Sequence, residues 1–182
     1  MKNLKNKKVL VRVDFNVPLK NKRVADNTRL LASLPTIKFL MKSKAKIILV
    51  SHLGRPEGKI VRSLKLDPVA RELATLLKKP VKKLETGNWR WSDKDRRYFK
   101  SQIREMRPGQ VLMLDNIRFS PNEEKNGRTL ARELAGLADK FVLDGFAVAH
   151  RANASVSGVA KYLPSFAGLL LSSEIAGLNQ VV

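Results

Sequence analysis

The sequence predicts an α/β fold: a doubly wound, three-layer α/β/α domain around a mostly parallel sheet of about six strands. Two observations predict this class. Short apolar runs, rich in β-branched residues, alternate along the chain with longer segments of helical period. The short runs are almost continuously apolar, as in parallel strands that helices cover on both faces. The 182 residues suffice for one domain with a sizeable core.

Five segments are predicted to be strands, four from a clear pattern and one from a weaker one. The clear segments are 8–15 (KVLVRVDF), 46–51 (KIILVS), 110–114 (QVLML) and 140–146 (KFVLDGF), and the weaker one is 81–84 (VKKL).

Four segments between these strands are predicted to be helices: 28–44, 66–79, 93–106 and 128–140. Pro35 lies inside the first, so we expect a break there, with Pro35 starting a second helix. In the second, Asp67 is the expected N-cap and Pro68 the first helical residue.

The chain is strongly basic, with 36 Lys and Arg against 16 Asp and Glu, a net charge of +20. Such a field attracts anions, both nucleic acids and small phosphorylated metabolites. Much of the charge lies in the patches KNLKNKK, LKNKR and DKDRRYFK, which also fit an ordinary solvated surface.

Several classes are excluded by composition. The chain has no cysteine, which excludes disulfides and thiolate chemistry, and its two histidines are far apart, so we expect no metal site. The N-terminus lacks the apolar core of a signal peptide, and no apolar run is long enough for a membrane span. We therefore expect a cytoplasmic protein. No G-x-G-x-x-G motif occurs, and GRPEGK is not a P-loop.

The residues that follow the predicted strands are the candidates for a site, because ligands of parallel α/β sheets bind at the carboxyl ends of the strands. Asp14 and Asn16 have the same parity after the first strand and suit a ligand that bears hydroxyl groups. A turn that caps the strand, supported by Pro18, explains the pair equally well.

Three strand ends each supply an arginine. Arg55 follows the second strand beside His52 and Gly54, and Arg118 and Arg151 follow two later strands, with His150 next to Arg151. Guanidinium groups are the best planar donors to phosphate or carboxylate. Three guanidinium groups at the same edge of the sheet require a strongly anionic ligand, because without one they repel each other.

Two further features, Arg29 and a pair of tryptophans, each have two possible interpretations. Arg29, at the start of a predicted helix, opposes the helix dipole, an unfavourable placement unless an anion lies nearby. The alternative is a solvated arginine that overhangs the helix terminus. Trp89 and Trp91 lie among basic residues in TGNWRWSDKDRRYFK. They could stack on nucleic acid bases, although such residues more often anchor a loop or helix on the domain.

Five blocks, in this order, resemble the N-terminal domain of the phosphoglycerate kinase family. They are VLVRVDFNVPLK, NTRLLASLPTIKFL, SHLGRPEG, LDNIRFSPNEEKN and FVLDGFAVAHRANASVSGVA, and the likeness covers about residues 7–182. The family transfers a phosphoryl group between 1,3-bisphosphoglycerate and ADP, giving 3-phosphoglycerate and ATP. Its N-terminal domain binds the phosphoglycerate, its C-terminal domain binds the Mg-nucleotide, and the two close by a hinge.

The resemblance implies a role for each candidate. Asp14 and Asn16, with Phe15 in the same motif, would hold the hydroxyl and carboxyl end of the substrate. Arg29 would contact the reacting carboxyl group and stabilise the transferring phosphoryl group, which makes it the catalytic candidate. The groups implied to hold the other phosphate are His52, Arg55, Arg118 and Arg151. His150 matches the motif only as the neighbour of Arg151.

Some positions depart from the family pattern. Asn153 stands where the family usually has a histidine, and LDN replaces the usual L-E-N. The stretch TGNWRWSDKDRR matches poorly and is interpreted as a local elaboration.

The family's nucleotide domain has no counterpart in these 182 residues. We therefore expect a phosphoglycerate-binding domain over 1–171 and the start of the interdomain helix over 172–182. Mg-ATP or Mg-ADP would bind only the absent domain, so this chain, expected to be a monomer, would bind 3-phosphoglycerate weakly and not turn over. The alternatives are a basic, non-catalytic domain of the same fold that binds nucleic acid, and a folded remnant without a ligand.

Overall fold

The computed structural model describes residues 3–178, in which the predicted α/β class is confirmed. The main sheet has six strands in the order β5-β6-β4-β1-β7-β8, and every neighbouring pair is parallel. The strands are β1 (Lys8–Val13), β4 (Lys46–Val50), β5 (Val81–Leu84), β6 (Val111–Leu114), β7 (Lys140–Asp144) and β8 (Ser165–Ala167). All six strands thus have their carboxyl ends on one side of the domain and their amino ends on the other.

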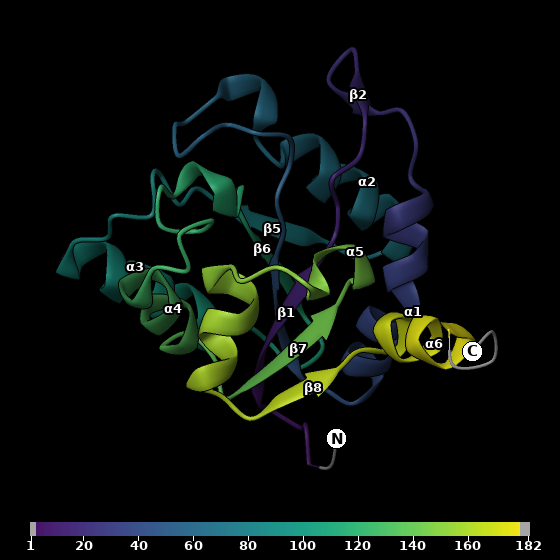
Figure 1. Ribbon diagram of the computed structural model, residues 1–182. Helices are drawn as coiled ribbons and strands as arrows, with labels where there is room; N and C mark the ends of the chain where they lie inside the picture. The colour runs from purple at the N-terminus through teal and green to yellow at the C-terminus, as the bar shows by residue number, and fades with distance from the viewer. Residues whose placement is uncertain (1–2, 179–182) are drawn as a thin grey trace.

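Helices cover both faces of this sheet. The α-helices are α1 (Thr28–Lys42), α2 (Asp67–Leu77), α3 (Asp93–Arg104), α4 (Arg128–Ala135), α5 (Phe146–Ala149) and α6 (Leu169–Leu178). Side chains of α1 and α2 share one buried apolar cluster, and those of α3 and α4 share the other. Figure 1 shows these pairs on opposite sides of the strands. Each fully buried Leu, Ile or Phe in the two clusters stabilises the fold by about 1.5–3 kcal/mol.

Pro35 does not break α1, which is continuous from Thr28 to Lys42, so the predicted break is wrong. Proline removes one backbone hydrogen bond, here the one to the carbonyl of Leu31. Pro35 and Leu31 are both exposed. Water can therefore bond that carbonyl, and the buried face of the helix continues on both sides of the proline.

Two predicted helix ends are also wrong. Asp67 is the first residue of α2 and not its N-cap; its carboxylate instead accepts a hydrogen bond from Lys83 Nζ at 2.9 Å. The helix predicted to reach residue 140 ends at Ala135, with Gly136 as its C-cap. The apolar period continued past the helix into a turn that leads to β7.

Several elements have no counterpart among the predicted ones. A small hairpin pairs β2 (Leu19–Lys20) with β3 (Arg23–Val24), and β8 extends the sheet. Short helical turns occur at Arg62–Leu64, Ile117–Phe119 and Val159–Lys161, and a π-helical turn at Ala154–Gly158. Within residues 3–178, no helix combines the length and apolar character needed to cross a membrane.

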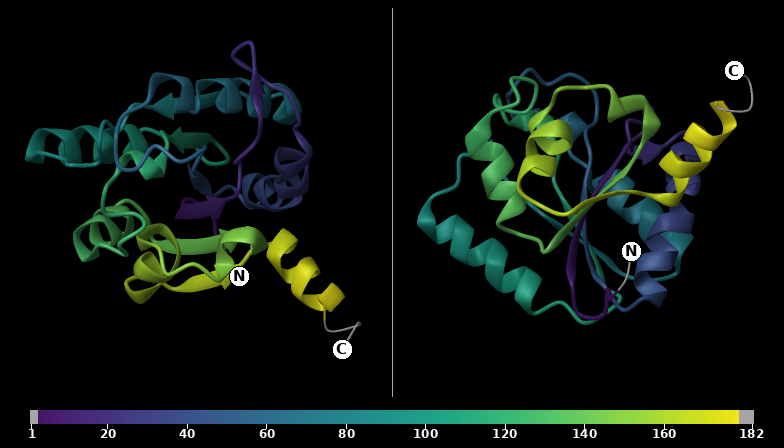
Figure 2. Two further views of the ribbon diagram at one scale, coloured as in Figure 1. Left: turned by 45° about the horizontal axis from the view of Figure 1, so that its top comes forward. Right: turned by 60° about the horizontal axis from the view of Figure 1, so that its bottom comes forward.

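The helix expected over 172–182 begins three residues earlier, at Leu169, as α6. Its first turn is tied to the sheet and to α1, because Leu170 N–H donates to Asp144 and Leu169 N–H to Thr36. Figure 2 shows α6 standing out from the rest of the chain. Residues 179–182 lie outside the described residues.

Candidate anion site

The predicted site residues lie at the carboxyl end of the sheet. Asp14 follows β1, His52 follows β4, Arg118 follows β6 and Arg151 follows β7 by way of α5. Since β6, β4, β1 and β7 are adjacent in the sheet, these side chains come from neighbouring strands.

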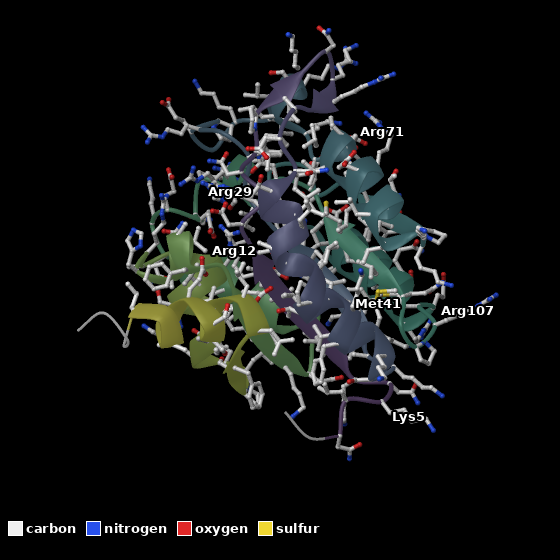
Figure 3. The ribbon with its side chains drawn as sticks, turned by 90° about the vertical axis from the view of Figure 1, so that its right-hand side faces the viewer. Lys5, Arg12, Arg29, Met41, Arg71 and Arg107 are labelled. Carbon is white, nitrogen blue, oxygen red and sulfur yellow. The ribbon has the colours of Figure 1, made fainter. Side chains whose placement is uncertain are left out.

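Asp14 and Arg29 form an ion pair. Arg29, in the first turn of α1, donates from Nη1 to the Asp14 carboxylate. The Arg29 side chain is 48% exposed and that of Asp14 only 9%. The carboxylate is therefore a fixed anchor, and the arginine is free to turn toward a ligand. In Figure 3 Arg29 lies at the start of α1, close to Arg12.

The loop that follows β4 is held by Asn16 and Arg118. Gly54 N–H donates to Asn16 Oδ1 at 2.8 Å, and Gly54 C=O accepts from Arg118 Nη1, also at 2.8 Å. Gly54 has a φ of +63°, a left-handed conformation that favours glycine. Asn16 and Arg118 thus shape this loop between them, and Gly54 links these two predicted site residues.

Arg12 is a member of the site that we did not single out from the sequence. It lies in β1, is 1% exposed, and donates to Ser155 Oγ at 2.8 Å and to the Val13 carbonyl. Its Nη2 lies 3.2 Å from His52 Nδ1. The available signal was a charged residue within an otherwise apolar buried strand, where a charge must be paired or functional.

A buried carboxylate balances Arg12. Glu123 is fully buried and accepts from Ser155 Oγ at 2.5 Å and from Ser155 N–H at 3.0 Å. Ser155 therefore bridges the two charges. Asn153 is buried and donates to Glu123 Oε1 at 3.3 Å. In this chain Asn153 thus supports the counter-charge of Arg12.

His52 is buried and surrounded by cations. Burial lowers its pKa from 6.5 to about 2, and the charges of Arg12, Arg118, Arg151 and Arg29 act in the same direction. An arginine N–H can only donate, so His52 Nδ1 accepts from Arg12 and the ring proton resides on Nε2. Asp14 Oδ1 lies 3.7 Å from Nδ1, but an unprotonated Nδ1 cannot donate to it. His52 is thus a neutral hydrogen-bond donor at neutral pH.

Two buried guanidinium donors have no hydrogen-bond partner among the described residues: Nε of Arg118 and Nε of Arg151. Arg118 Nε lies 3.1 Å from Glu124 Oε1, within ion-pair distance but without hydrogen-bond alignment. Burial lowers the pKa of Arg118, and the charges of Arg151 and Arg55 also lower it, against Glu124 and Glu123. Unpaired donors beside like charges are typical of a site built for an anion.

The remaining candidates differ in exposure. Arg55 and His150 are exposed, and His150 is the C-cap of α5. Phe15 is fully buried, and its backbone N–H donates to Ser51 Oγ at 2.9 Å. The Phe15 side chain is therefore part of the core, and only its backbone lies near the site.

Asp67, Glu85 and Asp115 form a separate acidic cluster at the same end of the sheet. Lys83 Nζ lies among them, at 2.9 Å from Asp67, 2.5 Å from Glu85 and 3.0 Å from Asp115. Burial alone would lower the pKa of Lys83, but these three hydrogen bonds raise it. The lysine supplies the cluster's positive charge, and Asp115 also accepts from Leu66 N–H at the start of α2.

Trp89 and Trp91 are 4% and 7% exposed, so neither ring can stack on a nucleic acid base. The interpretation of these residues as a base-stacking site is therefore wrong. Their rings stack on each other at 5.2 Å, and Trp91 packs on Phe99 of α3 at 4.4 Å. Each indole N–H donates to a backbone carbonyl, Asn116 and Thr86 respectively. They anchor the loop before α3 on the domain.

A cavity of about 810 Å³ lies beside the arginine site and not within it. It is bounded by the hairpin and the start of α2, and Asn16 and Gly54 form its border with the site. Its other walls combine apolar side chains, including Leu19, Leu53 and Leu64, with the basic side chains of Lys22, Arg62, Lys65 and Arg71. We place the anion site at Arg118 and Arg151, because their buried Nε donors have no hydrogen-bond partner among the described residues.

The comparisons with known proteins agree with the resemblance noted above. The model of the family "Phosphoglycerate kinase" matches residues 1–182. A phosphoglycerate kinase of Moorella thermoacetica is 52% identical over 179 residues, and one of Dictyoglomus turgidum is 53% identical over 172 residues. The alignments cover 98% and 94% of this chain but only 44% and 41% of those proteins.

Solved structures give the same relation. The structure of phosphoglycerate kinase from Coxiella burnetii matches 99% of this chain with a TM-score of 0.84 at 39% identity. That from Pyrococcus horikoshii OT3 matches 98%, also at 0.84, with 33% identity. The matched region makes up 43% and 44% of those chains. The chain thus spans less than half the length of these relatives.

Proposed function

The chain belongs to the phosphoglycerate kinase family, and on this premise we propose that the site at the carboxyl end of its sheet binds 3-phosphoglycerate. In the complete enzyme this site would present the substrate for phosphoryl transfer between 1,3-bisphosphoglycerate and ADP. Residues 1–171 would form the substrate domain, and α6 the start of the helix that leads to the nucleotide domain.

The observation that carries the proposal is that the buried Nε donors of Arg118 and Arg151 both lack an aligned hydrogen-bond acceptor among the described residues. A buried donor without an acceptor costs about 1–3 kcal/mol, so an anion that accepts from both recovers that cost. The phosphate that is not transferred has the charge and the number of acceptor oxygens to do so. The Nε2–H of His52 and the exposed guanidinium of Arg55 would complete its shell.

The other end of the substrate would lie against Asp14, Asn16 and Arg29. A substrate hydroxyl can donate to the Asp14 carboxylate, which Arg29 already holds in place. The exposed Arg29 guanidinium can then turn from Asp14 to the substrate's carboxyl group. In this role Arg29 neutralises charge on the reacting carboxylate and on the transferring phosphoryl group.

No general base is required for the reaction, since the attacking carboxylate is ionised at neutral pH. The low pKa of His52 agrees with this, because an imidazole with a pKa of about 2 is too weak a base to take up a proton at neutral pH. Catalysis is then positioning and charge stabilisation of an in-line transfer. Closure of a second domain would exclude water from the site.

The nucleotide belongs to the part of the family's length that this chain does not span. Mg-ATP or Mg-ADP would be held there, supplying the phosphoryl donor or acceptor and the metal charge. We therefore expect the 182-residue chain to bind 3-phosphoglycerate weakly and to show no turnover alone, because nothing in it closes over the ligand.

Isothermal titration calorimetry with 3-phosphoglycerate tests the proposal. We expect a saturable, weak isotherm for the parent chain and a loss of about tenfold or more in affinity for Arg55→Ala, which removes one charge-assisted bond of about 1.5–3 kcal/mol. Arg107→Ala, an exposed arginine at the other end of the sheet, is the control and should bind as the parent does. No binding by the parent, or equal binding by Arg55→Ala, would contradict the assignment.

A further inference from the structure

A strongly charged surface outside the proposed substrate site lies at the amino end of the sheet. The loops and helix ends there carry eight exposed cations, which we call the amino-end cluster. They are Lys5, Lys7, Lys42, Lys44, Lys78, Lys79, Arg104 and Arg107. In Figure 3 Lys5 and Arg107 lie at the same end of the molecule, the end away from Arg71.

Backbone hydrogen bonds hold the centre of this cluster together. Asn6 N–H donates to the Lys44 carbonyl at 3.0 Å, and Gly109 N–H donates to the Ala45 carbonyl at 2.7 Å. These bonds join the loops before β1, β4 and β6, which are neighbours in the sheet. Lys7, Lys44 and Arg107 therefore project from three adjacent loops of fixed geometry.

Little negative charge offsets the cluster. Among the described residues of these loops only Glu105 and Asp139 are acidic, and Asp139 pairs with Lys8 at 3.2 Å. No cation of the cluster lies within ion-pair distance of a carboxylate in residues 3–178. Most of the other acidic residues lie toward the carboxyl end of the sheet or along the helices, so the two ends differ strongly in local charge balance.

Helix stabilisation explains only part of the cluster. Lys42, Lys78 and Arg104 lie at the C-terminal ends of α1, α2 and α3, where a cation favours the helix dipole. The other five cations lie in loops, where they only repel their neighbours. An arrangement of like charges across several loops is complementary to a polyanion.

We propose that the amino-end cluster binds the phosphate backbone of double-stranded nucleic acid without reading its sequence. The loops that carry it have no exposed aromatic side chain among the described residues, so they offer nothing to stack on unpaired bases. Apolar anchors for a membrane are equally lacking in these loops. Backbone phosphates need neither, and exposed Lys and Arg side chains are their usual partners.

Fluorescence anisotropy with a labelled 20-base-pair duplex of arbitrary sequence, over a series of salt concentrations, tests the proposal. The test variant is Lys7→Glu/Lys44→Glu/Arg107→Glu. Its matched control is Lys20→Glu/Lys22→Glu/Arg23→Glu, which makes the same charge change on the exposed hairpin elsewhere on the surface. If the charge-reversed variant does not fold, as judged by circular dichroism, the triple glutamine variant at the same positions replaces it.

The parent should bind the duplex with an affinity that falls steeply with salt. The amino-end variant should lose at least about tenfold in affinity, and its log–log salt slope should be shallower by about 2–3, one for each phosphate contact removed. The hairpin control should stay within about threefold of the parent, and 3-phosphoglycerate should not displace the duplex.

Each other result overturns the proposal. No duplex binding by the parent at low salt, or equal losses in the two variants, would mean that the cluster is not a docking surface. Displacement by 3-phosphoglycerate would place the duplex at the arginine site instead. Binding to vesicles with 30% phosphatidylserine, without binding to the duplex, would identify a membrane surface.

Discussion

Both ends of the sheet are positively charged, but they hold that charge in different ways. At the carboxyl end, Arg12 and Arg118 are buried and fixed by partners, and the pKa values of both are lowered mainly by burial. At the amino end, Lys7, Lys44 and Arg107 are exposed and have no carboxylate partner within the described residues. The first end holds its charges in place through buried contacts, and the second presents a high density of exposed charges.

The two arrangements suit different kinds of ligand. A small dianion is recognised by a few donors with fixed directions, and holding buried donors in place requires buried counter-charges such as Glu123. A polymer is recognised by the sum of many screened charges, which need no fixed direction. The contrast predicts that equivalent substitutions at the two ends have very different effects.

The largest difference is expected from removing one positive charge at each end. Arg12→Met should lower the free energy of unfolding by about 3–5 kcal/mol, because it leaves the buried Glu123 carboxylate without its cation. Lys7→Met, the matched change at the amino end, should alter it by less than about 0.5 kcal/mol. Urea denaturation of both variants measures this difference. Similar losses of stability would contradict the distinction between the buried, partnered charge of Arg12 and the exposed charge of Lys7.

The second effect concerns pH. The unfolded chain binds a proton at His52 near pH 6.5, whereas the folded chain does so only near pH 2. Stability from this group is complete above pH 6.5 and is lost as the pH falls, by about 2 kcal/mol between pH 7 and pH 5. His52→Gln should show a correspondingly smaller loss over that range, and the exposed-site control His150→Gln should keep the parent's loss. Identical pH profiles for the parent and His52→Gln would refute the buried neutral histidine.

A smaller effect separates two glycines with positive φ, Gly54 at the carboxyl end and Gly109 at the amino end. Alanine at either position should cost about 1 kcal/mol or more in stability, since both conformations are strained for an L-residue. A Cβ on Gly54 would lie 2.8 Å from Leu64 Cδ2, and one on Gly109 would lie 3.2 Å from the Met41 carbonyl. Only Gly54→Ala should weaken 3-phosphoglycerate binding in calorimetry. An equal weakening by Gly109→Ala would mean that the Gly54 loop has no specific role in the substrate site.

The smallest effect is expected from Lys44→Ala, which should change the free energy of unfolding, measured by urea denaturation in low salt, by less than about 0.5 kcal/mol. A loss of more than 1 kcal/mol would show that Lys44 has a structural partner. Such a result would also weaken the case for the amino-end cluster as a free surface.

Much of the fold followed from local patterns. Continuous apolar runs predicted β1, β4, β6 and β7, because strands buried on both faces leave little room for polar residues. The break at Pro35 was not predictable in the same way, since proline is tolerated where its partner carbonyl faces water. The strand β8 (Ser165–Ala167) escaped prediction because it has only three residues, of which Ser165 and Ala167 are exposed and only Phe166 is partly buried.

The candidate site was predictable where sequence motifs mark strand ends, as with Asp14, His52 and Arg118. Arg12 and Glu123 were not singled out, because their roles depend on burial and on contact across more than a hundred residues through Ser155. The tryptophans show the opposite error: Trp89 and Trp91 lie among basic residues along the chain, yet the fold turns both rings inward.

The central claim is that 3-phosphoglycerate binds at the carboxyl end of the sheet and nowhere else in this chain. The most direct measurement is a titration of the ¹⁵N-labelled chain with 3-phosphoglycerate, followed by amide chemical shifts. The account predicts saturable shifts at Asn16, Gly54 and Arg118, with Lys44 and Gly109 unchanged. Shifts centred on Lys44 and Gly109, or no saturable shifts at all, would contradict it.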